Sequence, residues 1–230
     1  MNNNVKLDNN YTCIAFLGDC SGSMANINTE MLAESVNNII KQNKEKTDIV
    51  FYGAKFNDTF ELFSDGIDGC NVEITKDQLK PDGMTALMPS FARMIRIVGC
   101  RLDNMTERKP GKVIFILLSD GEQTIPYLIN KDEYDNPYEG RKGITNLRKL
   151  VKEHEEKCKW EFMFLGTNFD SIAVGESFGL NRKNCINYSY SSEGVSNVMR
   201  CVSDNVGRTI DGNSQGFLEN ERQESVLEKS

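Results

Sequence analysis

Short apolar runs that recur between amphipathic stretches constrain the fold of this chain more than any other feature. Within each run, consecutive positions are apolar, so a strand built from it has no polar face to turn toward water. Strands of this kind are typical of a parallel sheet that is covered by helices on both sides. The runs occupy residues 11–17, 49–56, 113–118, 162–165 and, more weakly, 185–190.

The stretches between these runs carry apolar residues at spacings of three and four, which predicts helices. A further short helix is expected near Asp170 to Phe178, ended by Gly179. The alternation predicts an α/β fold, a doubly wound and mostly parallel sheet with helices on both faces. Segment 59–74 contains two Asp-Gly pairs, which are typical of a hairpin and predict one short antiparallel edge strand. The four longer helical patterns lie at residues 31–40, 87–102, 147–158 and 195–210.

A chain of 230 residues is long enough for one well-buried domain and short for two. Both ends are polar and charged, without the apolar residues that a packed element requires. We therefore expect a flexible N-terminal segment (1–10), a single α/β domain (11–211) and a flexible C-terminal tail (212–230).

Charge and cysteine usage exclude several classes of function. The formal net charge is -7, and no lysine or arginine cluster is interleaved with aromatic residues, so we expect no nucleic-acid or membrane binding. The seven cysteines are widely spaced and include no Cys-x-x-Cys, which disfavours a zinc site or a disulfide framework. No apolar signal core or membrane-length run is present, so we expect a cytoplasmic protein.

The residues most suggestive of chemistry follow the first apolar run, in the sequence LGDCSGSM. Here Asp19, Ser21 and Ser23 alternate, so one extended turn can direct all three side chains the same way. The strong run at 113–118 is followed by Asp120, and Thr85 precedes the second helical pattern. Ligands of open α/β sheets bind outside the carboxyl ends of the strands, where these residues are expected to converge. Because all five donors are oxygens, they predict Mg²⁺, with Mn²⁺ or Ca²⁺ as alternatives.

The series Asp19-x-Ser21-x-Ser23, Thr85 and Asp120 resembles the metal-ion-dependent adhesion site (MIDAS) of the von Willebrand factor A (vWA) domain family, over roughly residues 10–210. The resemblance implies that the serines bind the cation directly, that the threonine and aspartates bind directly or through water, and that one position stays open. It further implies a non-enzymatic module that binds the Asp or Glu carboxylate of a protein partner in an intracellular assembly or regulatory complex. By family analogy, that partner is an AAA+ ATPase or another assembly component.

Two other functions remain open: a metal-dependent hydrolase or phosphatase that uses the same cation, and a structural subunit with a vestigial site. The first is disfavoured because the spacing is not that of a nucleophile elbow, since Cys20 stands where the serine belongs. The sole histidine, His154, lies on the apolar face of its helical pattern and is expected in the core. Cys20 is expected to be a packed and inert thiol.

The stretch from Glu122 to Gly143 is long for a connection between a strand and a helix. It carries three tyrosines on the edge of the sheet where the metal site is expected. They form either a rim that contacts the partner or part of a solvated insertion. The candidate partner-binding residues are Tyr127, Tyr134 and Tyr138.

Overall fold

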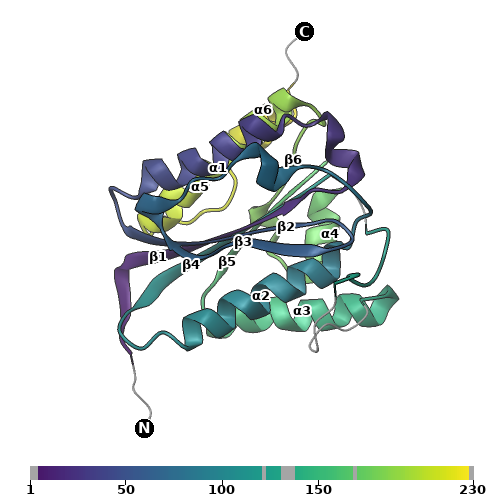
Figure 1. The fold of residues 1–230 in the computed structure, drawn as a ribbon. Helices are drawn as coiled ribbons and strands as arrows, with labels where there is room; N and C mark the ends of the chain where they lie inside the picture. The colour runs from purple at the N-terminus through teal and green to yellow at the C-terminus, as the bar shows by residue number, and fades with distance from the viewer. Residues whose placement is uncertain (1–4, 121–122, 131–137, 168–169, 228–230) are drawn as a thin grey trace.

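The computed structural model describes residues 5–120, 123–130, 138–167 and 170–227. Its centre is one six-stranded sheet with the strand order β3-β2-β1-β4-β5-β6 (Figure 1). Strand β3 pairs antiparallel with β2 at one edge, and the other neighbouring strands run parallel. The predicted doubly wound, mostly parallel sheet with an antiparallel edge strand is confirmed. The strands are β1 (Leu7–Asp19), β2 (Asp48–Phe56), β3 (Phe60–Asp68), β4 (Lys109–Ser119), β5 (Glu161–Gly166) and β6 (Cys185–Asn187).

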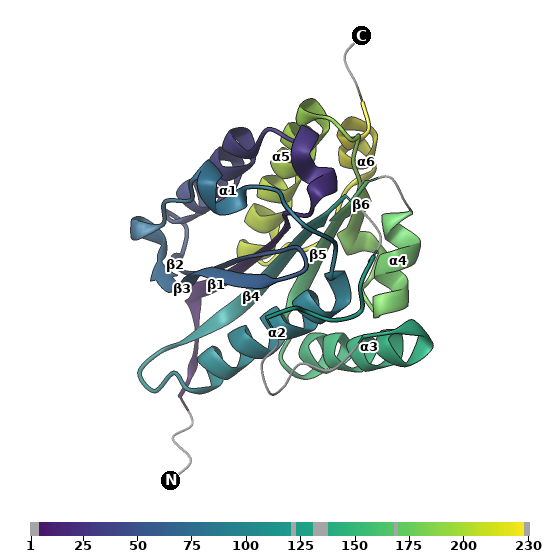
Figure 2. The same ribbon diagram turned by 45° about the vertical axis from the view of Figure 1, so that its right-hand side comes forward.

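Helices cover both faces of the sheet (Figures 1 and 2). One layer contains α1 (Thr29–Asn43), α5 (Ser192–Ile210) and α6 (Glu219–Ser225). The opposite layer contains α2 (Leu87–Asp103), α3 (Gly140–Lys157) and α4 (Ser171–Phe178). Four short 3₁₀ turns complete the described structure: η1 (Gly22–Asn26), η2 (Gly69–Asn71), η3 (Lys76–Leu79) and η4 (Arg182–Asn184).

Strand β1 shows why the apolar runs lack a polar face. Ile14 and Phe16 pack into the core beneath α1 and α5, whereas Cys13 and Leu17 pack into the core beneath α2. All four side chains are at most 1% exposed. Because a helical layer lies on each side, both parities of the strand require apolar residues.

The ends of α4 follow local sequence signals. The side chain of Asp170 accepts hydrogen bonds from the N–H groups of Ile172 and Ala173, so it caps the helix as its residue type predicts. Gly179 ends the helix in the left-handed conformation, with φ 94°.

The hairpin turn lies elsewhere than the Asp-Gly pairs suggested. The chain reverses between β2 and β3 at Asn57, whose side-chain oxygen accepts hydrogen bonds from the N–H and hydroxyl of Thr59. The first Asp-Gly pair instead lies within β3, where Gly66 has φ 72° and the pairing with β2 shifts register. The left-handed glycine therefore produces a β-bulge rather than a turn.

The segments expected to be flexible are partly ordered. Strand β1 already begins at Leu7, and residues 1–4 lie outside the described part of the chain. At the other end, Phe217 is 5% exposed, and α6 follows it. Helix α6 is held to α5 by Arg208, whose guanidinium donates hydrogen bonds to both carboxylate oxygens of Glu221. A tail with few apolar residues thus docks through the buried Phe217 and through polar contacts of α6, which include the Arg208–Glu221 pair and hydrogen bonds from Arg222 and Ser225 to backbone carbonyls.

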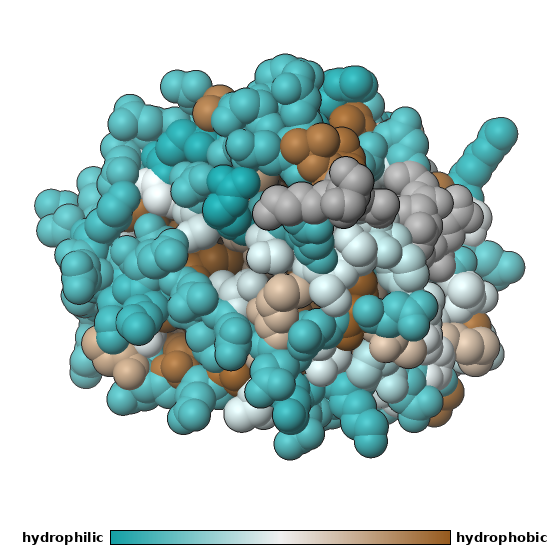
Figure 3. Space-filling view, turned by 90° about the horizontal axis from the view of Figure 1, so that it is seen from above, coloured by the Kyte–Doolittle hydropathy of each residue, from teal (hydrophilic) through white to brown (hydrophobic). Residues whose placement is uncertain are grey.

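The face made by α1, α5 and α6 is largely hydrophilic, with small apolar patches (Figure 3). Within the described ranges, no helix combines the length and apolar character needed to cross a membrane. The seven cysteines are free thiols, as the absence of a disulfide pattern predicted.

Candidate metal centre

The register of the sheet places the last residues of β1 and β4 side by side. Gly18 pairs with Leu118, so Asp19 follows at the carboxyl end of β1 next to Ser119 of β4. The hydroxyl of Ser119 donates a hydrogen bond to Asp19 Oδ2 at 2.6 Å, and the Ser21 N–H donates to Asp19 Oδ1 at 2.8 Å. Asp19 is completely buried, so its carboxylate is fixed by these two neutral donors.

A chain of side-chain contacts continues from this carboxylate to the next strand. Ser21 Oγ lies 3.0 Å from Ser23 Oγ, and Ser23 Oγ donates to Asp120 Oδ1 at 2.8 Å. Ser21 and Asp120 are each 1% exposed, whereas Ser23 is exposed. Four of the five predicted ligands are therefore brought together, and the cluster opens to solvent at Ser23.

Thr85, the fifth predicted ligand, is placed by backbone hydrogen bonds between loops. The Gly22 N–H donates to the carbonyl of Gly83 at 3.0 Å, which joins the loop of the two serines to the loop of Thr85. The Thr85 N–H donates to Thr124 Oγ1, and the Thr124 N–H donates to the Thr85 carbonyl. Thr85 is 4% exposed beside the cluster.

Two buried carboxylates share this cluster, and the protein destabilises their charge. Burial raises the pKa of Asp19 to about 6, against the opposing effect of hydrogen bonds from Ser119 and Ser21 and with a contribution from the nearby charge of Asp120. Burial also raises the pKa of Asp120, opposed by its hydrogen bond from Ser23. Buried carboxylates held by neutral hydroxyl and amide donors retain a demand for positive charge.

The donor set fits a hard divalent cation. It offers two carboxylates and three hydroxyls, all oxygen, which are the ligand types of Mg²⁺, Mn²⁺ and Ca²⁺. The part of the chain that the structure describes holds no group of three or more His, Cys, Asp or Glu side chains able to bind a metal. Three of the five candidate donors here are hydroxyls, so they lie outside that pattern.

Sequence analysis missed three residues of this centre. Ser119 contacts Asp19, and the buried Tyr188 donates a hydrogen bond to the Ser119 carbonyl at 3.4 Å. Tyr190 donates to the Ser23 carbonyl. The sequence signals available were the serine directly before Asp120 and the two tyrosines that alternate at the end of the last apolar run.

The bond from Tyr190 to Ser23 leads to a first prediction. Tyr190→Phe removes a donor that fixes the turn containing Ser23, so we expect the Mg²⁺ affinity to fall about threefold to tenfold, in proportion to the loss of one hydrogen bond. Isothermal titration calorimetry measures the change. Tyr11→Phe is the matched control, because Tyr11 lies against Arg108 away from the centre. Equal Mg²⁺ affinity in the wild type and Tyr190→Phe would contradict a supporting role for this tyrosine.

The three candidate rim tyrosines have different outcomes. Tyr127 is 43% exposed, as a partner-contacting residue requires. Tyr138 is only 5% exposed, and its hydroxyl accepts a hydrogen bond from Arg96 Nη1 at 3.0 Å. Its assignment to the rim is therefore wrong, because its ring belongs to the core beneath α2. Tyr134 lies outside the described residues.

Two further expectations concern residues that were not assigned to the site. Cys20 is 1% exposed, its thiol donates to the Leu79 carbonyl, and burial raises its pKa to about 12, as expected of a packed thiol. His154 Nδ1 lies 2.8 Å from the Leu150 carbonyl, and its ring packs 4.5 Å from that of Trp160. The histidine is thus part of the structure of α3.

Neither a protein-family model nor a curated protein sequence matches this chain. Solved structures do resemble it in fold. A von Willebrand factor type A protein from Catenulispora acidiphila has a TM-score of 0.55 at 14% identity, over 85% of this chain and 42% of its own. The PilB minor pilin from Streptococcus sanguinis has a TM-score of 0.55 at 14% identity, over 87% of this chain and 62% of its own. The vWF domain of the type V pili tip protein Mfa5 from Porphyromonas gingivalis has a TM-score of 0.54 at 11% identity, over 91% of this chain and 98% of its own.

The chain therefore has the fold of a von Willebrand factor type A domain, as the resemblance in sequence implied. It spans less than two thirds of the length of each of the first two proteins and nearly all of the Mfa5 domain. Identities this low establish the fold alone, since one fold carries many functions.

Proposed function

We propose that this chain is a divalent-cation-dependent protein-binding module that engages an Asp or Glu carboxylate of a partner. The observation that carries the proposal is the cluster in which the buried Asp19 and Asp120 are linked through Ser21 and Ser23. The Ser21 N–H binds Asp19, the two hydroxyls contact each other, and the Ser23 hydroxyl binds Asp120. The negative charge of two buried carboxylates requires a compensating positive charge, and a cation bound by these oxygens would provide it.

The residues that would hold Mg²⁺ are Asp19, Ser21, Ser23, Thr85 and Asp120. When bound, the cation supplies an electron-poor centre for an outside carboxylate. The chain itself keeps the donors in place: Ser119 and the Ser21 N–H orient the Asp19 carboxylate. Three of the donors are neutral hydroxyls, which reduce the charge of the ion less than carboxylates do. An anionic ligand from a partner therefore remains favoured.

Binding rather than hydrolysis is supported by the position of the sole histidine. His154 is hydrogen-bonded within α3 and packed against Trp160, so it is not placed to serve as a general base for Ser21 or Ser23. Asp19 is completely buried, which disfavours its use as a nucleophile toward a substrate.

We also propose the cytoplasm as the compartment. The supporting observation is that the seven cysteines are free thiols, which is typical of reducing compartments. The pilus proteins that share the fold share too little sequence to assign a location.

Calorimetric titration with Mg²⁺ tests the metal centre directly. We expect one binding site in the wild type, loss of binding in Asp120→Ala, and binding at least about tenfold weaker in Ser23→Ala, which removes a proposed direct ligand. Asp204→Asn and Ser35→Ala are matched controls, since both residues lie on helices away from the cluster. A wild-type protein that binds neither Mg²⁺ nor Mn²⁺ would overturn the proposal.

A further inference from the structure

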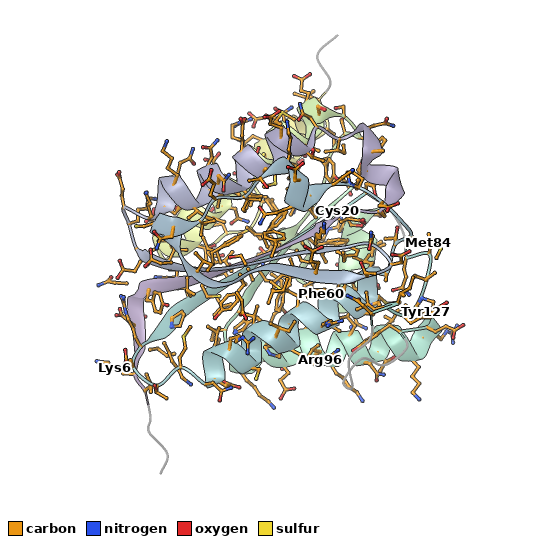
Figure 4. The ribbon with its side chains drawn as sticks, in the orientation of Figure 1. Lys6, Cys20, Phe60, Met84, Arg96 and Tyr127 are labelled. Atoms are coloured by element: carbon orange, nitrogen blue, oxygen red, sulfur yellow. The ribbon has the colours of Figure 1, made fainter. Side chains whose placement is uncertain are left out.

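Exposed apolar side chains gather beside the candidate metal centre. Met84, directly before Thr85, is 48% exposed, and Tyr127 and Ile129 are 43% and 61% exposed. Met84 and Tyr127 lie at the same end of the molecule, opposite Lys6 (Figure 4). We call these three residues, Met84, Tyr127 and Ile129, the apolar rim.

The two loops that carry the rim are hydrogen-bonded to each other and to the metal centre. The carbonyl of Thr85 accepts hydrogen bonds from the N–H groups of Thr124 and Ile125. The Ile129 N–H donates to the carbonyl of Asp58, whose carboxylate oxygens lie 2.9 Å from the position that a Cβ at Gly83 would occupy. The apolar rim therefore lies on loops that are bonded to, or adjacent in sequence to, Thr85, which is one of the candidate ligands.

The loop of Tyr127 and Ile129 is anchored on both sides of these residues. Leu128 is 1% exposed, so it is buried in the core between them. The side-chain amide of Asn130 pairs with the backbone of Phe60, accepting from its N–H at 2.9 Å and donating to its carbonyl at 2.7 Å. A backbone held in this way presents its outward side chains in a fixed arrangement, which lowers the entropic cost of binding.

The charge around the rim restricts the kind of acidic partner that fits. The carboxylate of Asp58 lies beside Gly83. Asp82, which directly precedes Gly83 in the sequence, is exposed. The whole chain carries a net charge of -7. A segment with several acidic residues would bring a carboxylate close to Asp58 or Asp82 on the side of Met84, whereas a single carboxylate surrounded by apolar side chains would not.

We infer that the partner segment carries one Asp or Glu flanked by apolar residues, with the carboxylate on the metal ion and its neighbours against Met84, Tyr127 and Ile129. The inference rests on the proposed function, since the carboxylate is recognised by the cation. It adds that the apolar rim selects the sequence around that carboxylate. Exposed apolar side chains near a polar centre are typical of a protein interaction site.

Selection from a displayed library of random peptides tests this inference. The library is bound to the immobilised protein in Mg²⁺ and eluted with EDTA. We expect the recovered peptides to share one Asp or Glu with apolar residues on at least one side. The most enriched peptide is then measured by fluorescence anisotropy, where replacement of its acidic residue by the amide should abolish binding.

A triple variant of the rim and a double control variant separate the effect of the rim from that of the metal. The rim variant Met84→Ser, Tyr127→Ser, Ile129→Ser should bind that peptide about tenfold more weakly or worse. Its Mg²⁺ affinity by calorimetry should match the wild type. The control Leu7→Ser, Ile67→Ser removes exposed apolar side chains from β1 and β3 and should leave peptide affinity unchanged.

The outcomes distinguish the inference from the proposed function. Peptides eluted by EDTA that carry acidic residues in polar or polyacidic sequences would overturn the inference alone. So would full peptide affinity in the rim variant. Absence of any peptide whose binding requires Mg²⁺ would overturn both the inference and the proposed function.

Discussion

Replacing Asp19 with asparagine is expected to make the metal-free protein more stable at pH 7, by about 3 kcal/mol in the free energy of unfolding. Most single substitutions lower the free energy of unfolding. The opposite sign follows here because the fold buries a carboxylate that only a cation would compensate.

The size of the effect comes from the pKa of the buried carboxyl group. Burial raises the pKa of Asp19 from its ordinary value of 3.8 to about 6. Each pKa unit corresponds to about 1.4 kcal/mol, and the shift is the free energy lost by keeping the charged form in the folded state. Asparagine carries no charge, and its side chain can still accept from the Ser21 N–H and donate to Ser119.

The pH dependence has a definite sign. The pKa of Asp19 is higher in the folded than in the unfolded state. Below pH 3.8 the carboxyl group is mostly protonated in both states, so the free-energy penalty for burying its charge is absent. The penalty grows between about pH 4 and pH 6 and is complete above the folded pKa. The stability advantage of Asp19→Asn should therefore be large at pH 7 and small at pH 4.

Urea unfolding in EDTA at these two pH values measures the difference, provided that the slope with denaturant is unchanged. In excess Mg²⁺, the wild type should become more stable, because a ligand bound only by the folded state shifts the equilibrium. Asp19→Asn should gain little. The exposed Asp204→Asn is the control and should change stability by less than about 0.5 kcal/mol. An Asp19→Asn protein that is less stable than the wild type in EDTA at pH 7 would refute the prediction.

The architecture was predictable because the apolar pattern of the central strands indicates whether one or both faces of the strand are covered. Phe16 and Leu17 point to opposite helical layers, and only a strand covered on both faces requires apolar residues at both positions. Asp170 and Gly179 act through contacts with their immediate neighbours, so the sequence reveals them without knowledge of the fold. The four site residues in contact were predictable because strand ends of a parallel sheet share one edge.

The supporting residues of the site were not predictable in this way. Ser119 contacts Asp19 only because β1 and β4 pair in one register, and Tyr190 reaches Ser23 across 167 positions of sequence. The wrong assignment of Tyr138 also arose because tertiary contacts cannot be read from the sequence. Its residue type suits a rim or a core, and only packing against α2 decides between them.

The tail between residues 212 and 227 shows how few residues can order a polar segment. Its composition predicted flexibility, yet Phe217 is buried, and Glu221 of α6 is 3% exposed. The Arg208 guanidinium binds Glu221 through two parallel hydrogen bonds of 2.8 and 2.9 Å. The carboxylate also accepts the Leu218 N–H at 2.7 Å, at the start of the helix. One side chain thus joins α6 to α5 and caps its own helix.

Glu221→Ala is therefore expected to lower the free energy of unfolding by about 2–3 kcal/mol. It leaves the partly buried guanidinium of Arg208 without its carboxylate and removes the acceptor of the Leu218 N–H. We expect a smaller decrease in the free energy of unfolding than for a fully buried ion pair, because the Arg208 side chain is 22% exposed. Urea unfolding measures it, and hydrogen exchange at the Leu218 amide should accelerate as α6 detaches.

Glu224→Ala is the matched control on the same short helix. Glu224 pairs with Arg200 at 2.7 Å, but both side chains are substantially exposed, so its removal should cost less than about 1 kcal/mol. Both variants replace a glutamate of the same helix by alanine, so the difference between them reports the Arg208–Glu221 pair together with the hydrogen bond from the Leu218 N–H. If Glu221→Ala and Glu224→Ala have the same small effect, the Arg208–Glu221 pair does not contribute to the stability of the domain and the prediction is wrong.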